Sequence, residues 1–423
     1  MTPLTEMNVH APVAGRRIAL FAGAYNHISD GVALTLNRLV LYLENRGAKV
    51  LVFAPTINKH PPAVRHTGTL ISVPSIPFPG RSDYRLTVGL SRKGWSSLEA
   101  FDPDLVHIAT PDYAGAQALK WAKSREVPVV SSFHTHFAAY LKHFASYNPL
   151  YRMDLLENTA WKYGRWFYTQ VEHIYVPSPS IGDELRAQGI TNGIKVWARG
   201  VDAQRFSPDH RSLAWRLAHG FAEKDVIVTY VGRLVWEKKL SVFAEVIESL
   251  KTQGIAHRSL VVGDGPVRDT LRERLTDTVF TGPLHGEELS SAYASSDIFL
   301  FPSDTETFGN VTLEAMASGL PTVCADAAGS DLLVMDGKTG YLAPPNDTPA
   351  FLTHVKTLIS DPSLRIKMGE AARSRAEAFE WKNVMGHLAS YYEEIWNARN
   401  GDGGNGVAAH GAAVNVPVRK AVA

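Results

Sequence analysis

The hydrophobic pattern opens with a short apolar run at 18–21, a glycine-bearing loop, an amphipathic stretch at 33–46 and a second apolar run at 50–54. Short apolar runs predict buried strands, and the amphipathic stretch predicts a helix between them. Further strand-like runs, each bracketed by helical or turn-rich segments, lie at 105–109, 127–133 and 174–177. The first half of the chain therefore predicts a βαβ opening that extends into one doubly wound α/β domain.

A second series of strand-like runs alternates with helical stretches later in the chain. These runs lie at 226–232, 259–262, 279–281, 298–301 and 321–324. They are almost continuously apolar, which is typical of parallel strands covered on both faces. The sequence thus predicts two Rossmann-like domains that face each other across a cleft, with ligands bound at the carboxyl ends of the strands.

The domain boundaries follow from a polar, proline-containing stretch at 202–211, which we interpret as a linker. A chain of 423 residues is too long for one core. We expect a flexible N-terminus, an N-terminal domain, a C-terminal domain, a C-terminal helix that crosses back to the first domain, and a disordered tail. Their bounds are 1–16, 17–205, 212–380, 381–399 and 400–423.

Composition and charge narrow the function classes. Lys and Arg number 43 against 42 for Asp and Glu, so no overall field favours nucleic acid, and we expect no nucleic-acid partner. Cys324 is the only cysteine, which excludes an internal disulfide and favours a reducing cytoplasm. The first 17 residues lack the apolar stretch of a signal peptide, and no apolar run approaches 18 residues, so we expect a cytoplasmic chain that does not cross a membrane.

The most specific segment, 301–321, reads as a strand, a loop, a helix and a helix stop. Glu306 lies in the loop and Glu314 on the helix, which ends at Gly319. A carboxylate before the helix can accept hydrogen bonds from sugar hydroxyls, and one a turn inside can bind a ribose. Each glutamate alone is more often an ordinary solvated residue, and only their combination with the flanking Phe-Gly-Asn favours a binding site.

The start of this helix predicts an anion site. The loop and first turn, Phe308 to Val311, expose the unpaired N–H groups of Gly309, Asn310 and Val311. Gly309 also permits close approach of a ligand to the backbone. We therefore expect phosphate or sugar oxygens to bind here.

A basic pair follows the first strand of the second domain. Arg233 lies at the strand's carboxyl end and Lys238 five residues later. A guanidinium and an ammonium stabilise the charge that grows on a diphosphate leaving group, so no metal or other cofactor is required. The alternative is a pair of surface charges ahead of a helix. Gly263 ends the next strand and would turn near a nucleotide base, although a lone glycine-rich turn is weak evidence.

The first domain offers two candidate residues near strand ends. Its first loop holds Gly23 and Gly31 but lacks the full G-x-G-x-x-G pattern, which disfavours a dinucleotide-dependent dehydrogenase. A later strand ends in His134-Thr135-His136. The two histidines could bind zinc, but no third ligand accompanies them, and a core histidine is a further alternative.

These motifs resemble glycosyltransferase family 4, whose retaining enzymes have the GT-B architecture. Glu306 and Glu314 have the family's spacing of two glutamates separated by seven residues, and the segment matches Ser-x-x-Glu-x-Phe-Gly-x-x-x-Leu-Glu-Ala-Met-Ala-x-Gly. The resemblance implies that Glu306 faces the donor sugar and that Glu314 binds the ribose. The second domain would then bind the nucleotide sugar and the first domain the acceptor.

The resemblance also gives roles to the other candidates. Arg233 and Lys238 match the family's Gly-Arg-Leu-x-x-Glu-Lys and would bind the β-phosphate, although Lys239 stands where many relatives have Gly. Gly31 would approach the donor phosphates. His134, in Phe-His-Thr, would contact the sugar or the developing charge.

Aromatic and cationic residues predict the acceptor surface. Phe137 and Tyr140 begin a stripe at helical spacing, and a second cluster interleaves rings with cations. The second cluster contains Trp161, Lys162, Arg165 and Trp166. Such residues suit the surface of an anionic membrane, whereas the alternative is that the rings pack the core of the first domain.

Four segments are similar to a sub-group of the family that acts on lipids. They are 102–109, 132–137, 197–202 and 306–311. The sub-group contains sulfoquinovosyldiacylglycerol synthases, lipid α-mannosyltransferases and bacterial glucosyl- or glucuronosyl-diacylglycerol synthases. This resemblance implies transfer of a hexose or hexuronic acid, with UDP-glucose or UDP-glucuronate favoured, to a lipid such as diacylglycerol at the inner face of the membrane. The alternatives are a GDP-mannose-dependent mannosyltransferase, a nucleotide-sugar epimerase of the same architecture and a non-catalytic sensor.

Overall fold

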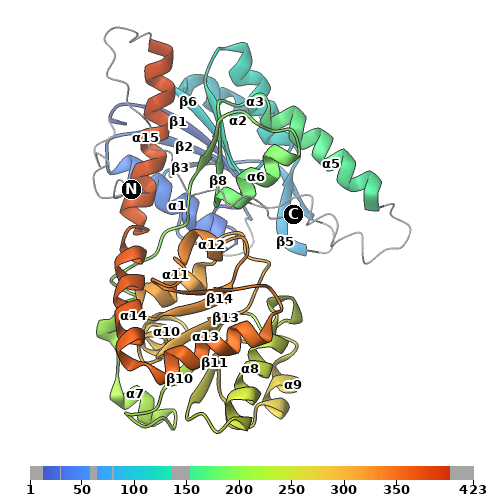
Figure 1. The fold of residues 1–423 in the computed structure, drawn as a ribbon. Helices are drawn as coiled ribbons and strands as arrows, with labels where there is room; N and C mark the ends of the chain where they lie inside the picture. The colour runs from blue at the N-terminus through green and yellow to red at the C-terminus, as the bar shows by residue number, and fades with distance from the viewer. Residues whose placement is uncertain (1–12, 29, 58–63, 79–80, 135–152, 401–423) are drawn as a thin grey trace.

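The computed structural model describes residues 13–28, 30–57, 64–78, 81–134 and 153–400. Two α/β units lie one above the other in Figure 1, each built on its own parallel sheet. The expectation of two doubly wound domains is confirmed.

The N-terminal sheet has seven parallel strands in the order β3-β2-β1-β6-β7-β8-β9. Their bounds are β1 Arg17–Phe21, β2 Lys49–Ala54, β3 Thr69–Ser72, β6 Leu105–Ile108, β7 Val129–Ser132, β8 His173–Val176 and β9 Ile194–Val196. The helices of this unit are α1 Gly31–Glu44, α2 Arg92–Phe101, α3 Tyr113–Ser124, α5 Met153–Tyr168 and α6 Pro179–Ala187. The hydrophobic pattern did not predict the antiparallel hairpin of β4 Ser75–Phe78 and β5 Arg81–Thr87, because β4 has only four residues and is partly exposed, and the mostly polar sequence of β5 contains no apolar run.

The C-terminal sheet has six parallel strands in the order β12-β11-β10-β13-β14-β15. Their bounds are β10 Ile227–Val231, β11 Arg258–Val262, β12 Val279–Gly282, β13 Ile298–Phe301, β14 Thr322–Ala325 and β15 Gly340–Ala343. Its helical segments are η2 Pro208–His210, α7 Leu213–Ala218, η3 Trp236–Lys238, α8 Leu240–Thr252, α9 Arg268–Arg274, α10 Gly286–Ala294, α11 Asn310–Ala317, α12 Ser330–Leu333, α13 Thr348–Ser360 and α14 Pro362–Glu377.

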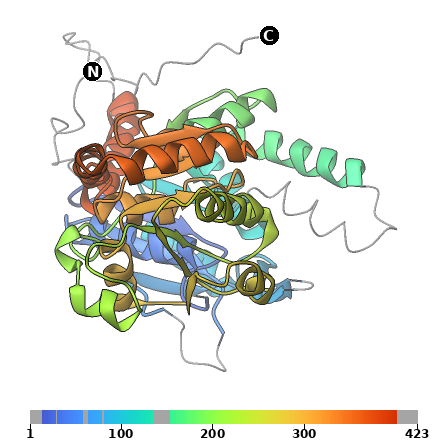
Figure 2. The ribbon, with the colours of Figure 1, turned by 60° about the horizontal axis from the view of Figure 1, so that its bottom comes forward.

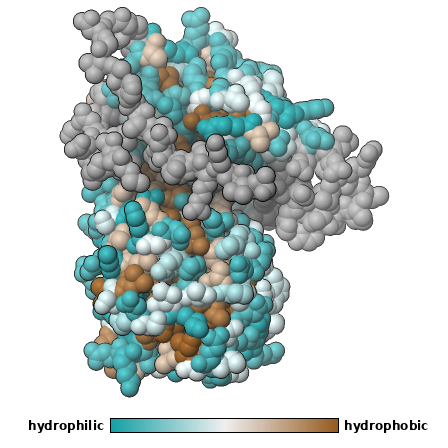
Figure 3. Space-filling model, viewed as in Figure 1, coloured by the Kyte–Doolittle hydropathy of each residue, from teal (hydrophilic) through white to brown (hydrophobic). Residues whose placement is uncertain are grey.

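The two central strands of this sheet, β10 and β13, are buried along their whole length. Helices cover both faces of the sheet, so its apolar strands form one large core. The outer surface seen in Figure 3 is mostly hydrophilic over this domain, with scattered hydrophobic residues. The apolar sides of the amphipathic helices therefore face the sheet.

The last helix, α15 Trp381–Asn400, returns to the N-terminal domain, where it lies beside α1 in Figure 1. Leu388 and Tyr392 belong to the same buried cluster as Leu36 and Val40 of α1. Trp396 Nε1 donates a hydrogen bond to the carbonyl of Asp104 at 3.1 Å. Helix α15, near the C-terminal end of the chain, thus completes the hydrophobic core of the N-terminal domain.

Two chain segments cross between the domains side by side. Val201 pairs with Glu380 in a parallel bridge, and its N–H donates to Phe379 O at 2.9 Å. At Gly200, a Cβ would lie 2.5 Å from the Trp381 ring, so a larger residue would push the two segments apart. Arg373 donates hydrogen bonds to the carbonyls of Ala203 and Phe206, which fixes the first segment to α14.

We expect Leu388→Ala to lower the free energy of unfolding by about 2–4 kcal/mol, because it removes a fully buried side chain from the N-terminal core. The matched control is Leu217→Ala, at a leucine that is 61% exposed, and it should change this energy by less than about 0.5 kcal/mol. Urea titration of the three proteins measures both values. Equal effects of the two substitutions would contradict the packing of α15 described above.

Candidate functional site

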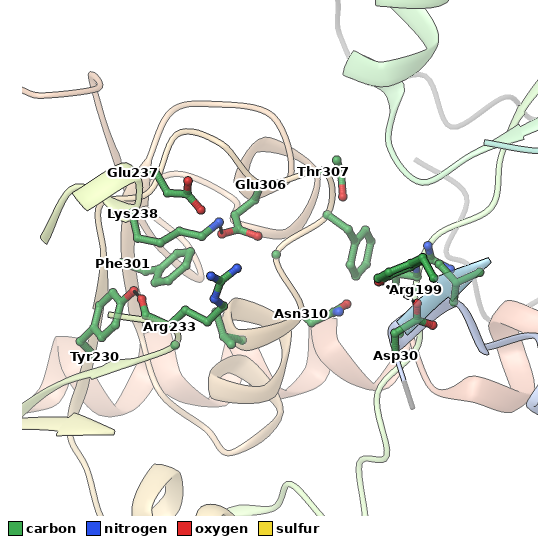
Figure 4. Close-up of a pocket in the computed structure, with 17 residues that line it drawn as sticks. Asp30, Arg199, Tyr230, Arg233, Glu237, Lys238, Phe301, Glu306, Thr307 and Asn310 are labelled. Atoms are coloured by element: carbon green, nitrogen blue, oxygen red, sulfur yellow. Dashed lines mark hydrogen bonds and ion pairs between the residues drawn. The ribbon is translucent and has the colours of Figure 1, made fainter. Parts of the chain in front are cut away.

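A cavity of about 460 Å³ lies between the two domains. Residues Asp30, Gly31, Val32, Tyr84 and Arg199 line it from the N-terminal side, and the others come from the C-terminal domain. The latter are Tyr230, Gly232, Arg233, Glu237, Lys238, Phe301, Glu306, Thr307, Phe308, Gly309, Asn310 and Val311. The structure therefore brings most of the predicted donor-site residues to one place (Figure 4).

The start of α11 opens into this cavity. Gly309 adopts a left-handed conformation with φ of 86°, which a larger residue would reach only with strain, and the helix begins at Asn310. The N-cap residue is Gly309 itself, which has no side chain to cap the first turn. The N–H groups at this helix start are thus available to the oxygens of an anionic ligand.

Glu306 and Lys238 form an ion pair at the edge of the cavity. Lys238 Nζ lies 2.6 Å from Glu306 Oε1, and Ser303 Oγ donates to the same oxygen at 3.2 Å. Lys238 follows β10 and Glu306 follows β13, and these two strands are neighbours in the sheet. Strand pairing therefore joins two residues that are 68 positions apart.

Arg233 follows β10 directly and points toward the same space in Figure 4. No carboxylate within the described part of the chain forms an ion pair with its guanidinium, whereas Lys238 is already paired with Glu306. The Arg233 side chain can therefore bind a phosphate without breaking an internal bond.

Glu314 lies one turn deeper in α11 and does not line the cavity. The Tyr293 hydroxyl of α10 donates a hydrogen bond to Glu314 Oε2 at 3.0 Å. Burial raises the pKa of Glu314 to about 7, against the smaller opposing effects of the Tyr293 hydrogen bond and the charge of Arg205. The carboxylate that should bind a ribose is therefore only partly ionised at neutral pH.

Gly263 also lies outside the cavity lining. It follows β11 with φ of 136°, and a Cβ there would lie 1.9 Å from the carbonyl oxygen of Gly232. The structure thus gives Gly263 a packing role, since it lets two strand ends approach each other. Binding of a base near it stays a prediction.

On the N-terminal side, the hydrophobic pattern predicts that Gly31 lies in the loop before the first helix. In the structure Gly31 is instead the first residue of that helix, α1. Asp30 caps this helix by accepting from Ala33 N at 2.8 Å, and its second oxygen accepts from the Tyr84 hydroxyl at 3.1 Å. A Cβ at Gly31 would meet nothing within 4 Å, so the space in front of it is open to a ligand.

His134 follows β7 and lies behind the cavity wall. Its Nδ1 is 3.1 Å from an amino group of Arg199, which does line the cavity. Five further polar residues of the cavity wall were not predicted as site residues from the sequence, namely Asp30, Tyr84, Arg199, Glu237 and Thr307. An aspartate directly before a predicted helix is a capping signal that could have indicated Asp30.

The predicted acceptor surface is divided by the structure. Phe137 and Tyr140, like His136 of the alternative zinc pair, lie outside the described residues. Trp161 on α5 is only 8% exposed and packs in the core, as the alternative for the aromatic cluster predicts. Lys162 and Trp166 are exposed on the same helix, and Arg165 is half-buried, with a hydrogen bond to Gln188 O.

Two Rossmann-like domains that face each other across a cavity define the GT-B class of glycosyltransferase. A solved structure of sucrose-phosphate synthase from Thermosynechococcus elongatus has this fold and superposes with a TM-score of 0.69 at 20% identity, over 90% of this chain and 100% of that one. The GT-B expectation is confirmed.

The chain belongs to glycosyltransferase family 4. The model described as "Glycosyltransferase Family 4" matches residues 29–205, and "Glycosyl transferases group 1" matches 213–375. The protein is a hexosyltransferase of this family.

Curated relatives include enzymes named for lipid and mannose transfer. Sulfoquinovosyl transferase SQD2 of Arabidopsis thaliana is 36% identical over 90% of this chain and 74% of its own length. A GDP-mannose-dependent alpha-mannosyltransferase of Corynebacterium glutamicum is 31% identical over 90% and 89%. An alpha-monoglucosyldiacylglycerol synthase of Streptococcus pneumoniae is 24% identical over 77% and 75%.

The raised pKa of Glu314 leads to a stability prediction. The folded protein holds this proton more tightly than the unfolded chain, so the group lowers stability as pH rises from about 4.5 through 7. Glu314→Gln keeps an acceptor for Tyr293 but removes the charge. It should raise the free energy of unfolding by about 1–3 kcal/mol at pH 8, with a much smaller gain at pH 5.

Urea titration at both pH values measures this gain, and Glu273→Gln, at an exposed glutamate of α9, is the control with no pH-dependent effect. The same Glu314→Gln variant should bind the donor more weakly if a carboxylate is needed for the ribose. Destabilisation by Glu314→Gln at pH 8 would contradict a buried carboxylate that resists ionisation.

Proposed function

We propose that this transferase moves a hexose or hexuronic acid from a nucleotide diphosphate sugar to a membrane lipid such as diacylglycerol, with retention of the anomeric configuration and without a metal ion. UDP-glucose and UDP-glucuronate are the favoured donors. The observation that carries the proposal is the shared cavity of Arg233, the Lys238–Glu306 pair and the start of α11.

In this arrangement, different residues bind the diphosphate and the sugar of the donor. Arg233 and the N–H groups of α11 bind the diphosphate, whose negative charge grows as the bond to the sugar breaks. Lys238 is already held by Glu306, so a phosphate that approaches Lys238 frees one carboxylate oxygen of Glu306 for a sugar hydroxyl. The positive charges then stabilise the transition state more than the bound donor, which is the work otherwise done by a divalent cation.

Lipid as the acceptor is supported by relatives and by one surface. Two of the relatives are named for sulfoquinovosyl transfer and for synthesis of a glucosyl-diacylglycerol. Helix α5 extends away from the body of the N-terminal domain (Figure 1 and Figure 2), with Lys162 and Trp166 exposed. An exposed indole beside an exposed ammonium suits the headgroup region of an anionic membrane. None of the helices in the described residues is long and apolar enough to cross a bilayer.

A GDP-mannose donor is the second candidate, because a mannosyltransferase is 31% identical over most of both chains. The two candidates share the diphosphate site and differ only in the base and the sugar. A direct comparison of UDP-glucose, UDP-glucuronate and GDP-mannose therefore decides between them.

We expect the purified protein, with diacylglycerol vesicles and EDTA, to form an α-linked glycolipid from one of these three donors. Mass spectrometry identifies the product, and NMR of the anomeric proton reports retention. Arg233→Met should lower kcat by a factor of about 100–1,000 with an unchanged thermal midpoint, because its guanidinium acts on the leaving group and forms no ion pair within the described part of the chain.

The matched control is Arg186→Met, at an exposed arginine on α6, which should keep full activity. Product formed only after addition of a divalent cation would contradict metal independence. Conversion of the donor to another sugar without any acceptor would indicate an epimerase instead.

The membrane surface has its own test. The protein should float with vesicles that contain an anionic lipid and not with neutral vesicles, and the double substitution Lys162→Glu and Trp166→Ala should lower the floated fraction severalfold. Lys382→Glu makes the same charge change at an exposed lysine of α15 and should have little effect. Flotation of the double variant at the level of the unchanged protein would place the membrane contact elsewhere.

A further inference from the structure

Arg199 connects the cavity to a buried histidine. It follows β9, lines the cavity from the N-terminal side, and lies beside Asp30 in Figure 4, across the gap from Arg233 and Glu306. One amino group of Arg199 is 3.1 Å from His134 Nδ1. The same guanidinium therefore belongs both to the cavity wall and to the surroundings of His134.

The Arg199 guanidinium keeps its charge in this position. Burial lowers its pKa to about 10, and the nearby carboxylate of Asp30 opposes that effect. Asp30 is itself held by the first turn of α1 and by the Tyr84 hydroxyl. At neutral pH, Arg199 is thus a fixed cation that can only donate hydrogen bonds.

A donor-only partner determines the chemistry of the imidazole. Since Arg199 donates to Nδ1, this nitrogen must carry a lone pair, and the proton of the neutral ring must sit on Nε2. Burial lowers the pKa of His134 well below its ordinary value, and the positive charge of Arg199 and the neighbouring His107 act in the same direction. The ring therefore stays neutral.

The plane of the ring is fixed from a third side. The indole of Trp197 meets the His134 ring edge-on at 5.5 Å between centroids, while His107 is held by bonds to Ser132 and Tyr392 and so offers His134 no hydrogen bond. The Nε2 atom of His134 is buried and has no hydrogen-bond partner among the residues that the structure describes. The other ring nitrogen, Nδ1, already accepts a hydrogen bond from Arg199, so the N–H group at Nε2 is the donor that is available to a ligand.

We propose that Arg199 is a positioning residue, which holds His134 as a single neutral tautomer with its proton on Nε2, ready to donate to an oxygen of the bound substrate. The proposal rests on the proposed function in one respect, namely that the donor sugar reaches the Nε2 atom of His134, which lies behind Arg199 and does not line the cavity. His134 is then a hydrogen-bond donor that neither gains nor loses a proton during the reaction, because Arg199 fixes its tautomer and keeps the ring neutral.

The tautomer can be measured without any turnover. Protein with ¹⁵N-labelled histidine should give a His134 signal, identified by its loss in His134→Gln, with a protonated Nε2 and an unprotonated Nδ1 that do not change between pH 6 and 8. If His134 of the unsubstituted protein carries its proton on Nδ1, or titrates between pH 6 and 8, the proposal is wrong, and no variant is needed to show it.

Substitutions at Arg199 separate positioning from mere structure. Arg199→Met should let His134 exchange between tautomers and take up a proton at the acid end of the range, with kcat lowered about 10- to 100-fold and donor KM changed less than threefold. Arg199→Lys, which also only donates, should restore the tautomer and most of kcat, and Arg186→Met serves again as the matched control. Should Arg199→Met not fold, Arg199→Gln removes the charge and adds a carbonyl oxygen that can accept from Nδ1–H, so it should also let His134 exchange between tautomers, whereas Arg199→Lys should not.

A folded Arg199→Met protein with the His134 tautomer and kcat of the unchanged protein would refute the proposal. Loss of transfer in every assay, combined with the expected tautomer, would instead refute the proposed function and leave the role of Arg199 intact.

Discussion

The pairing of β10 with β13 is the constraint on which the site depends. The chain leaves β10, adds β11 and β12 on one side, and returns to place β13 on the other side of β10. Connections that leave neighbouring strands in opposite directions open a crevice at their carboxyl ends, and here Arg233 and Lys238 follow one strand and Glu306 the other. The ion pair between Lys238 and Glu306 is the local result of this topology.

The N-terminal sheet repeats the same reversal between β1 and β6. Asp30 and Gly31 follow β1, and Gly23 in the same loop donates to Thr110 Oγ1 after β6 at 3.0 Å. The cavity therefore lies where the reversal points of two sheets face each other. Helix α15 and the paired segments around Val201 and Glu380 bind the domains to each other, so they help to set the distance across which these two crevices meet.

Much of this arrangement could be predicted from the sequence, because strand ends and helix starts carry local signals. Glycine at 309, the glutamates on either side of it and the arginine after a buried strand are visible without a structure. Arg199 lies in the segment 197–202 that resembles the lipid-acting sub-group, but its place in the cavity wall was not predicted, since it follows a strand of only three residues that gives no periodic signal. The burial of Glu314 was not either, because it depends on Tyr293 from another helix.

The surface of α5 shows a different limit. Trp161 and Trp166 look alike in a cluster of rings and cations, but a helix turns by about 100° per residue, so five positions separate their directions by well over a right angle. Trp161 faces the core with Phe167 and Tyr168, while Trp166 shares the outer face with Lys162, four positions earlier. The helical spacing alone could have divided these residues between two faces of the helix. Which of the two faces is buried could be decided only from the core that packs against it.

The charged side chains that line the cavity almost balance one another. Lys238 is paired with Glu306 and the charge of Asp30 acts on Arg199, whereas Arg233 forms no ion pair among the described residues. Glu237 is the third carboxylate that lines the cavity. A diphosphate needs more than one positive charge, and the second is available only when Lys238 exchanges its carboxylate for a phosphate. Because Glu306 loses its partner in that exchange, its freed oxygen gains most from a sugar hydroxyl at the same moment. Under the proposed roles, in which Lys238 binds the phosphate and Glu306 the sugar, binding of the two halves of a nucleotide sugar would be coupled through this one ion pair. A free diphosphate would then leave Glu306 partly unsatisfied, so recognition of the sugar would be linked to recognition of the phosphate.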